Sequence, residues 1–104
     1  MVIYRDEYRL YNFGPSHPFS PVRLEMLISL LQALGVWREP LVPREATREE
    51  VLSVHSERLV KRVEMASRGE GVPDLEHYGL GTGDTPVFPG MDRAARILVG
   101  GTLE

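Results

Sequence analysis

The chain contains no cysteine, which excludes disulfide bonds and thiolate metal sites and fits a cytoplasmic protein. No apolar run approaches the ~20 residues needed to cross a bilayer, so we expect no membrane partner. Residues Met1–Arg5 are not a charged leader followed by an apolar block, so we also expect no signal peptide. With 104 residues and an apolar share of 42%, the chain can form at most one small domain with a core.

Lysine and side-chain amides are also scarce. Lys61 is the only lysine, and Asn12 and Gln32 are the only side-chain amides. Few thermolabile residues are typical of heat-adapted proteins, but a GC-rich genome also favours arginine over lysine, so both explanations stay open. The net charge of −3 argues against a protein that binds nucleic-acid phosphates, which would need a basic surface.

Helix signals begin after a proline-rich loop. Ser20 is a good N-cap and Pro21 fits the first helical position, and Gly35 has the place of a left-handed C-cap. The apolar stripe of this helix is so broad that we expect neighbours on most of its sides. Thr47 and Glu50 form a capping-box pattern that predicts a short second helix.

Two further helices are predicted. One runs from about Glu57 to Arg68, between the N-cap Ser56 and Gly69, and the last starts near Met91. Favourable acid-first pairs at four-residue spacing are expected on the outer face of the former. These pairs are Glu57–Lys61 and Glu64–Arg68.

Strand signals are few. Val2–Tyr4 predicts a short buried strand and Leu41–Val42 a second one. If about four to six large helix side chains lack a partner, each loses about 1.5–3 kcal/mol, which together rivals a domain's net stability of about 5–15 kcal/mol. We therefore expect residues 1–104 to be an incomplete piece of a larger α/β domain; alternatively, the chain self-associates through these faces.

The segment Tyr78–Pro86 holds three glycines and a proline, which exclude a regular helix or strand. It predicts a tight, exposed loop of the kind that often carries recognition. Asp84 in this loop has two interpretations. It is either the cap of the turn or helix that follows, or an acceptor for substrate N–H groups at a pocket rim. A hydrogen bond to a charged acceptor contributes roughly 1.5–3 kcal/mol.

Arg23 lies in the first turn of the first predicted helix, where a cation meets the positive end of the helix dipole. It is either a long side chain lying along the surface, or a buried arginine held by backbone carbonyls that handles an anion. The sequence leaves both open.

Other chemistry is weakly signalled. His17, His55 and His77 are far apart and fit no metal-binding spacing, so we expect no zinc site from this chain alone. There is no Gly-x-Ser-x-Gly elbow and no phosphate-binding Gly-Lys-Ser/Thr. The predicted helix pair within 47–69 could suggest a helix-turn-helix, but interleaved glutamates cancel its basic charge, so we expect no nucleic-acid partner.

Two blocks carry a resemblance to a known family. One is 11–24, which reads YNFGPSHPFSPVRL, and the other is 78–91 together with Gly100–Leu103; Val54–Ser56 also fits. On these motifs the chain resembles the N-terminal part of bacterial acetoin utilization proteins, which are members of the histone deacetylase family. The resemblance covers essentially the whole chain.

The resemblance implies a fold and an activity. The family has a single α/β domain, a three-layer αβα arrangement around a parallel sheet called the arginase/deacetylase fold. Its members use a zinc-bound water to remove acetyl groups from lysine amines. Residues 1–104 would be the N-terminal segment of one such domain, mostly helical within this segment. Asp84 looks like the rim aspartate that binds the substrate backbone, and Arg23 like the arginine lining an internal channel.

The family's zinc ligands, paired histidines and tyrosine have no counterpart in this sequence. We therefore expect zinc only in a full-length parent, and neither catalysis nor a bound metal from these residues alone. The parent's partners would be acetylated lysine proteins or small acetylated amines, in acetoin or acetate utilization. The alternative is a free-standing, self-associating interaction module without catalysis.

Overall fold

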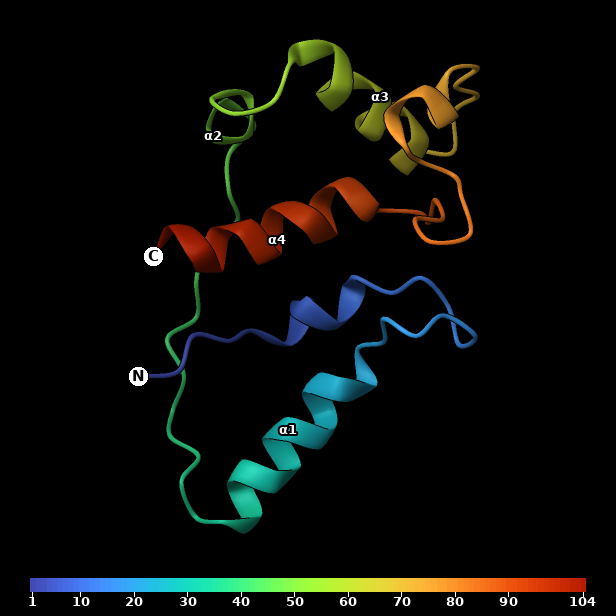
Figure 1. The fold of residues 1–104 in the computed structure, drawn as a ribbon. Helices are drawn as coiled ribbons and strands as arrows, with labels where there is room; N and C mark the ends of the chain where they lie inside the picture. Colours follow the sequence, from blue (N-terminus) through green and yellow to red (C-terminus); the bar gives the residue numbers. More distant parts are fainter.

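The computed structural model describes residues 1–104 as a set of helices joined by loops (Figure 1). The prediction of a mostly helical segment is confirmed. A three-layer αβα arrangement is not seen, because these residues contain no sheet. The elements are the short 3₁₀ helices η1 (Asp6–Leu10) and η2 (Leu75–Tyr78) and the α-helices α1 (Val22–Ala33), α2 (Arg48–Leu52), α3 (Glu57–Ser67) and α4 (Met91–Leu103).

The two predicted strands reduce to a single parallel bridge between Ile3 and Leu41. The Tyr4 N–H donates to the Leu41 carbonyl at 3.0 Å, and the Leu41 N–H donates to the Val2 carbonyl at 2.8 Å. The prediction of a buried strand over Val2–Tyr4 is wrong, because these residues are only half-buried. Two short strands form a stable sheet only with further strands or a covering layer, and neither is present here.

Helix α4 is the centre of the arrangement. It packs against η1 on one side and α3 on the other, and in Figure 1 it lies between them. Its buried residues recur at three-residue spacing, as expected for one face of a helix. They are Met91, Ala94, Ile97 and Gly100. The start near Met91 confirms the sequence prediction.

The extended segment 43–46 crosses α4 at very close range. The Ala46 N–H donates to the Arg96 carbonyl at 2.9 Å. A Cβ atom on Gly100 would lie 1.8 Å from the Arg44 carbonyl oxygen. Pro43 is fully buried at this crossing. The absence of a side chain at Gly100 is therefore what lets a backbone segment lie against the helix.

The caps of α2 and α3 match their predictions. The capping box of α2 has both halves, since the Thr47 hydroxyl accepts the Glu50 N–H and the Glu50 carboxylate accepts the Thr47 N–H. Hydrogen bonds from the Arg44 guanidinium and from the Thr47 backbone lower the pKa of Glu50 to about 2. The Ser56 hydroxyl accepts the Leu59 N–H at 3.2 Å at the start of α3.

One of the two predicted ion pairs on α3 is present. Lys61 lies 3.6 Å from Glu57, but the predicted Glu64–Arg68 pair is wrong. Glu64 instead binds Arg48 of α2 at 3.0 Å. Glu64 therefore pairs with an arginine of the neighbouring helix and not with one on its own helix, and this ion pair also joins α2 to α3.

Helix α1 begins one residue later than predicted. Pro21 is its N-cap, and the Ser20 hydroxyl accepts the Val22 N–H at 3.2 Å. Gly35, with a φ of 71°, ends the helix in the left-handed conformation, as expected. The neighbours expected on most sides of α1 are absent from this chain, because the helix has no buried residue. Figure 1 shows it projecting away from α4, beyond the N-terminal segment.

The chain as a whole buries little of itself. Only 8 of its 104 residues are buried. The radius of gyration is 15.4 Å, against about 13 Å expected for a compact domain of this length. The shortest dimension is only 18 Å, so most helices have no second layer of structure packed against them. None of the helices has the length and apolar content to traverse a bilayer.

We expect Gly100→Ala to destabilise the chain. In a helix interior, alanine is normally more stable than glycine by about 1 kcal/mol. Here, however, the methyl group would overlap the Arg44 carbonyl. We expect a loss of about 1–3 kcal/mol in the free energy of unfolding, measured by denaturant titration followed by circular dichroism. Gly71→Ala is the matched control, because open space surrounds Gly71; equal effects of the two substitutions would contradict the crossing.

Candidate functional site

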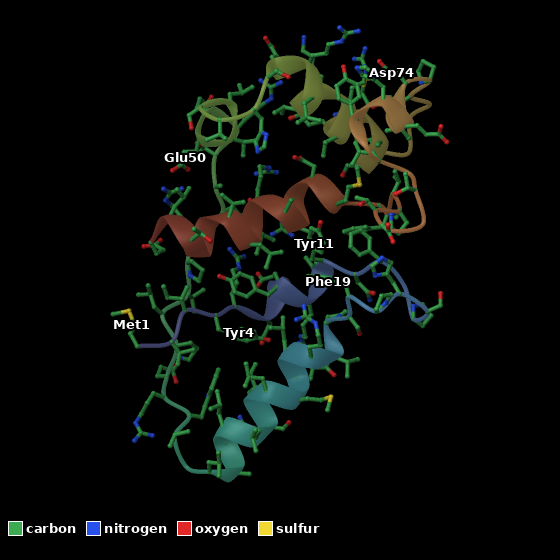
Figure 2. The ribbon with its side chains drawn as sticks, in the orientation of Figure 1. Met1, Tyr4, Tyr11, Phe19, Glu50 and Asp74 are labelled. Atoms are coloured by element: carbon green, nitrogen blue, oxygen red, sulfur yellow. The ribbon has the colours of Figure 1, made fainter.

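An aromatic cluster joins the loop after η1 to the segment before α4. The ring of Tyr11 lies 5.2 Å from Phe13, 5.7 Å from Phe19 and 5.5 Å from Phe88, all in edge-on arrangements. Phe13 also meets Phe88 edge-on at 5.5 Å. Figure 2 shows Tyr11 and Phe19 between α4 and the start of α1. Edge-on pairs of this kind add to the burial energy of the rings, so the cluster fixes the loop against α4.

A hollow of about 580 Å³ opens beside this cluster. Tyr11, Phe13, Phe19 and His17 form one side of its lining. Residues 84–85 form another part, and α4 contributes the small and apolar side chains Ala95, Leu98 and Val99. The hollow thus has an apolar surface with one carboxylate, that of Asp84, among its lining residues.

The loop that carries Asp84 is tight and exposed, as the sequence predicts. Gly79 and Gly81 have φ angles of 72° and 75°, which favour glycine over any other residue. The Gly81 N–H donates to the Thr85 carbonyl at 2.9 Å. The Thr85 N–H donates to the Thr82 hydroxyl at 3.1 Å. These internal bonds give the loop a defined shape.

Both ends of the loop region are anchored to α3. Before η2, Arg62 of α3 binds the Asp74 carboxylate at 2.9 Å and lowers the pKa of Asp74; Figure 2 shows Asp74 beside α3. After the loop, the Gly90 N–H donates to the Ser67 carbonyl at 3.1 Å, and the Asp92 N–H donates to the Ser67 hydroxyl at 3.2 Å. The last turn of α3 thereby satisfies the free donors at the start of α4.

The interpretation of Asp84 as a helix cap is wrong. The next helix, α4, starts only at Met91, and its N-cap residue is Gly90. Ser67 supplies the oxygen that a capping side chain would otherwise provide. Asp84 is exposed, and its carboxylate makes no hydrogen bond or ion pair. Its backbone carbonyl, in contrast, accepts a hydrogen bond from His17 Nε2 at 2.9 Å.

Arg23 is exposed at the start of α1 and has no acidic partner. Its guanidinium carbon lies 4.5 Å from the centroid of the Phe19 ring, a cation–π contact. It makes no hydrogen bond to a backbone carbonyl within this chain. Arg23 does not line the hollow beside Asp84, but Phe19 touches both.

A second hollow, of about 470 Å³, lies between α3 and α4. Like the first, it is mostly apolar, with Leu59, Val63 and Val99 among its lining residues. Its charged residues are already paired: Glu50 binds Arg44, and Asp92 binds Arg96. His55 and Tyr78 also line this hollow, but it holds no unpaired carboxylate or guanidinium.

The residues of this chain do not fit a metal site. No group of three or more histidine, aspartate or glutamate side chains comes together. His17 is bonded on both ring nitrogens, His55 lies between α2 and α3, and His77 lies in η2.

His17 is the residue that sequence reasoning missed. The sequence suggests only a turn at His17-Pro18, because nothing local indicates a partner 67 residues away. The glycines before Asp84 indicate that another part of the chain can approach this loop closely. They do not identify which residue that is. The structure brings His17 and Asp84 together and leaves Arg23 on the far side of Phe19.

The histone deacetylase domain model matches residues 17–104. The chain belongs to this family, whose members are in general zinc-dependent. The family assignment expected from the two sequence blocks is confirmed.

Among the relatives is the acetoin utilization protein AcuC of Bacillus subtilis (strain 168), 40% identical over 97% of this chain. AcuC of Staphylococcus xylosus is 32% identical over the same share. The chain spans 27% of the length of each. Among solved structures, the HDA15 HD domain matches with a TM-score of 0.75 and 26% identity, over 96% of this chain and 28% of that one.

Proposed function

We propose that residues 1–104 form part of a zinc-dependent deacetylase domain, its N-terminal segment. The substrates would be acetylated lysine side chains or small acetylated amines, in a cytoplasmic role linked to acetoin or acetate utilization. The observation that carries this proposal is the family match over residues 17–104, together with the 40% identity to AcuC. The low burial of the chain supports it, since the uncovered helix faces would then lie against the rest of the domain.

In this proposal Asp84 binds the substrate backbone. Its carboxylate is exposed and unpaired, and it lies on a loop whose shape is fixed by internal hydrogen bonds. A loop of defined shape presents a carboxylate to N–H groups with little rearrangement of its backbone. The aromatic side of the hollow offers apolar surface next to the acceptor, which suits an alkyl chain ending in an acetamide.

Arg23 is proposed to line an internal channel and to attract the acetate that the reaction releases. Its guanidinium has no acidic partner that would neutralise it, and the Phe19 ring holds it by a contact that leaves its N–H groups free. In these roles Asp84 and Arg23 bind and orient. Zinc would supply the activated water and polarise the acetyl carbonyl, and its ligands would come from outside these residues.

The first test replaces Asp84 in the full-length deacetylase that contains this segment. We expect Asp84→Ala to raise KM for an acetyl-lysine peptide by about tenfold or more, because a hydrogen bond to a charged group is lost. Zinc content and the thermal midpoint should stay unchanged. Glu76→Ala is the control, since Glu76 is an exposed acid nearby, in η2. Loss of zinc, or an equal effect of Glu76→Ala, would show that Asp84 is misassigned.

The second test uses residues 1–104 alone. We expect no zinc-dependent turnover of an acetyl-lysine peptide and no stoichiometric zinc, because these residues bring no metal ligands together. Activity would be followed by acetate release and zinc by atomic absorption, with the full-length deacetylase as the positive control. Turnover that disappears on chelation and returns with zinc would refute the proposal that catalysis needs the rest of the domain.

A free-standing interaction module is the second candidate. The observation that favours it is the exposed apolar side of α1 and its C-cap, where Met26, Leu30 and Leu34 are 67%, 55% and 65% exposed. A patch of this kind on a soluble chain marks a contact surface. In a module it would pair with a second copy or a partner, whereas in a deacetylase segment it would pack inside the domain.

The solution mass of the isolated chain separates these cases. We expect a broad, concentration-dependent distribution above the monomer mass in analytical ultracentrifugation, because the uncovered faces associate without a defined partner. Replacing Leu30 and Leu34 together by glutamine should reduce this association. Val54→Gln, at an exposed apolar residue outside α1, should not. A single defined oligomer would favour the module, and a compact monomer that unfolds cooperatively would contradict both readings of the exposed faces.

A further inference from the structure

We propose that His17 is a positioning residue that holds the Asp84 loop in place for substrate binding. This inference rests on the proposed function, since it concerns how the Asp84 carboxylate is presented. Beyond the role of Asp84, it assigns a role to His17, the direction of its two hydrogen bonds and the tautomer of its ring. The observation that carries it is a chain of two hydrogen bonds through the imidazole ring of His17.

The two hydrogen bonds select one tautomer of His17. The Phe19 backbone N–H can only donate, so His17 Nδ1, 3.0 Å away, must accept. The Asp84 carbonyl can only accept, so His17 Nε2, 2.9 Å away, must carry the proton. Only the neutral ring protonated at Nε2 satisfies both partners. The ring thus joins the backbone of one loop to the backbone of another in a single defined orientation.

The N-terminal loop gives this ring a rigid support. The Phe13 ring lies against His17 with 4.6 Å between centroids, and Phe13 is itself part of the aromatic cluster. The Asn12 side chain accepts the Gly14 N–H at 2.9 Å, and the His17 N–H donates to the Gly14 carbonyl at 3.3 Å. The imidazole is therefore held on one face and at its own backbone before it reaches Asp84.

The Asp84 loop, in contrast, has few ties to the rest of the chain. Between residues 79 and 86 the other hydrogen bonds stay within the loop or run to the adjoining η2. The bond from His17 is the only one that connects it to a distant element. Because it ends on the Asp84 carbonyl, it fixes the backbone of the residue whose carboxylate is proposed to bind the substrate. Without it, the loop would keep its shape but could move as a unit.

Two substitutions separate the halves of this bond chain. Asparagine at position 17 can place its carbonyl oxygen where Nδ1 accepts the Phe19 N–H, but it is too short to reach Asp84. Glutamine is long enough to present an amide N–H near the position of Nε2. His17→Asn therefore removes the link to the loop and spares the turn, and His17→Gln restores the donor.

The experiment measures KM and kcat for an acetyl-lysine peptide in the full-length deacetylase. We expect His17→Asn to raise KM by about three- to tenfold with kcat unchanged, as the loss of one neutral hydrogen bond predicts. His17→Gln should recover most of the wild-type KM. His55→Asn is the matched control, because His55 is exposed and its side chain makes no hydrogen bond. Zinc content and the thermal midpoint are measured for every variant.

A double-mutant cycle with Asp84→Ala shows whether His17 acts through Asp84. We expect His17→Asn to have almost no further effect on KM once the carboxylate is gone. If Asp84→Ala raises KM but His17→Asn does not, the positioning role is overturned and the proposed function stands. Additive effects, or a fall in kcat or zinc content with His17→Asn, also overturn the positioning role. If Asp84→Ala leaves KM unchanged, the proposed role of Asp84 fails and this inference fails with it.

Discussion

The structure depends on one close backbone crossing. Segment 43–46 lies directly on α4, and it can do so because Gly100 presents no side chain to the Arg44 carbonyl. The same crossing buries Pro43 and Ala46 and brings the Arg96 carbonyl within 2.9 Å of the Ala46 N–H. It sets where α2 can begin and hence where α3 lies along α4. The position of the Asp84 loop follows, because α3 holds the start of η2 through Arg62 in its middle and the start of α4 through Ser67 at its end.

Capping residues and apolar spacing in the sequence predicted most of the helices, but they did not predict which residues pack against them. Thr47, Ser56 and Gly35 act within a few residues of themselves, so their caps could be read from the sequence. Val2–Tyr4 has the composition of a buried strand, but burial depends on what lies on either side, and this chain supplies a single bridge. The ion pair of Glu64 shows the same limit, because its partner Arg48 comes from another helix. The broad apolar side of α1 predicts neighbours on most sides of this helix, but these residues supply none and leave it exposed.

In the candidate site, too, local features could be predicted from the sequence, whereas contacts between distant residues could not. A glycine-rich loop with one exposed carboxylate could be predicted, because glycine and proline exclude regular structure on their own. The choice between a cap and a ligand acceptor at Asp84 could not, since it depends on the Ser67 hydroxyl capping α4 from α3. His17 has no sequence signal that connects it to Asp84, and only the folding of the aromatic cluster brings the two loops together. The contact of Arg23 with Phe19 is local, four residues apart, but its meaning depends on what else would surround it.

The lack of any buried residue in α1 has a consequence for how the chain holds together. A helix that shelters nothing can open without exposing the residues around α4, so its opening and theirs are only weakly linked. We therefore expect these 104 residues to unfold as two cooperative units, one around α4 and one that is α1, with little effect of the second on the first. Any surface that covers α1 would therefore do more than add contacts: it would merge the two units into one.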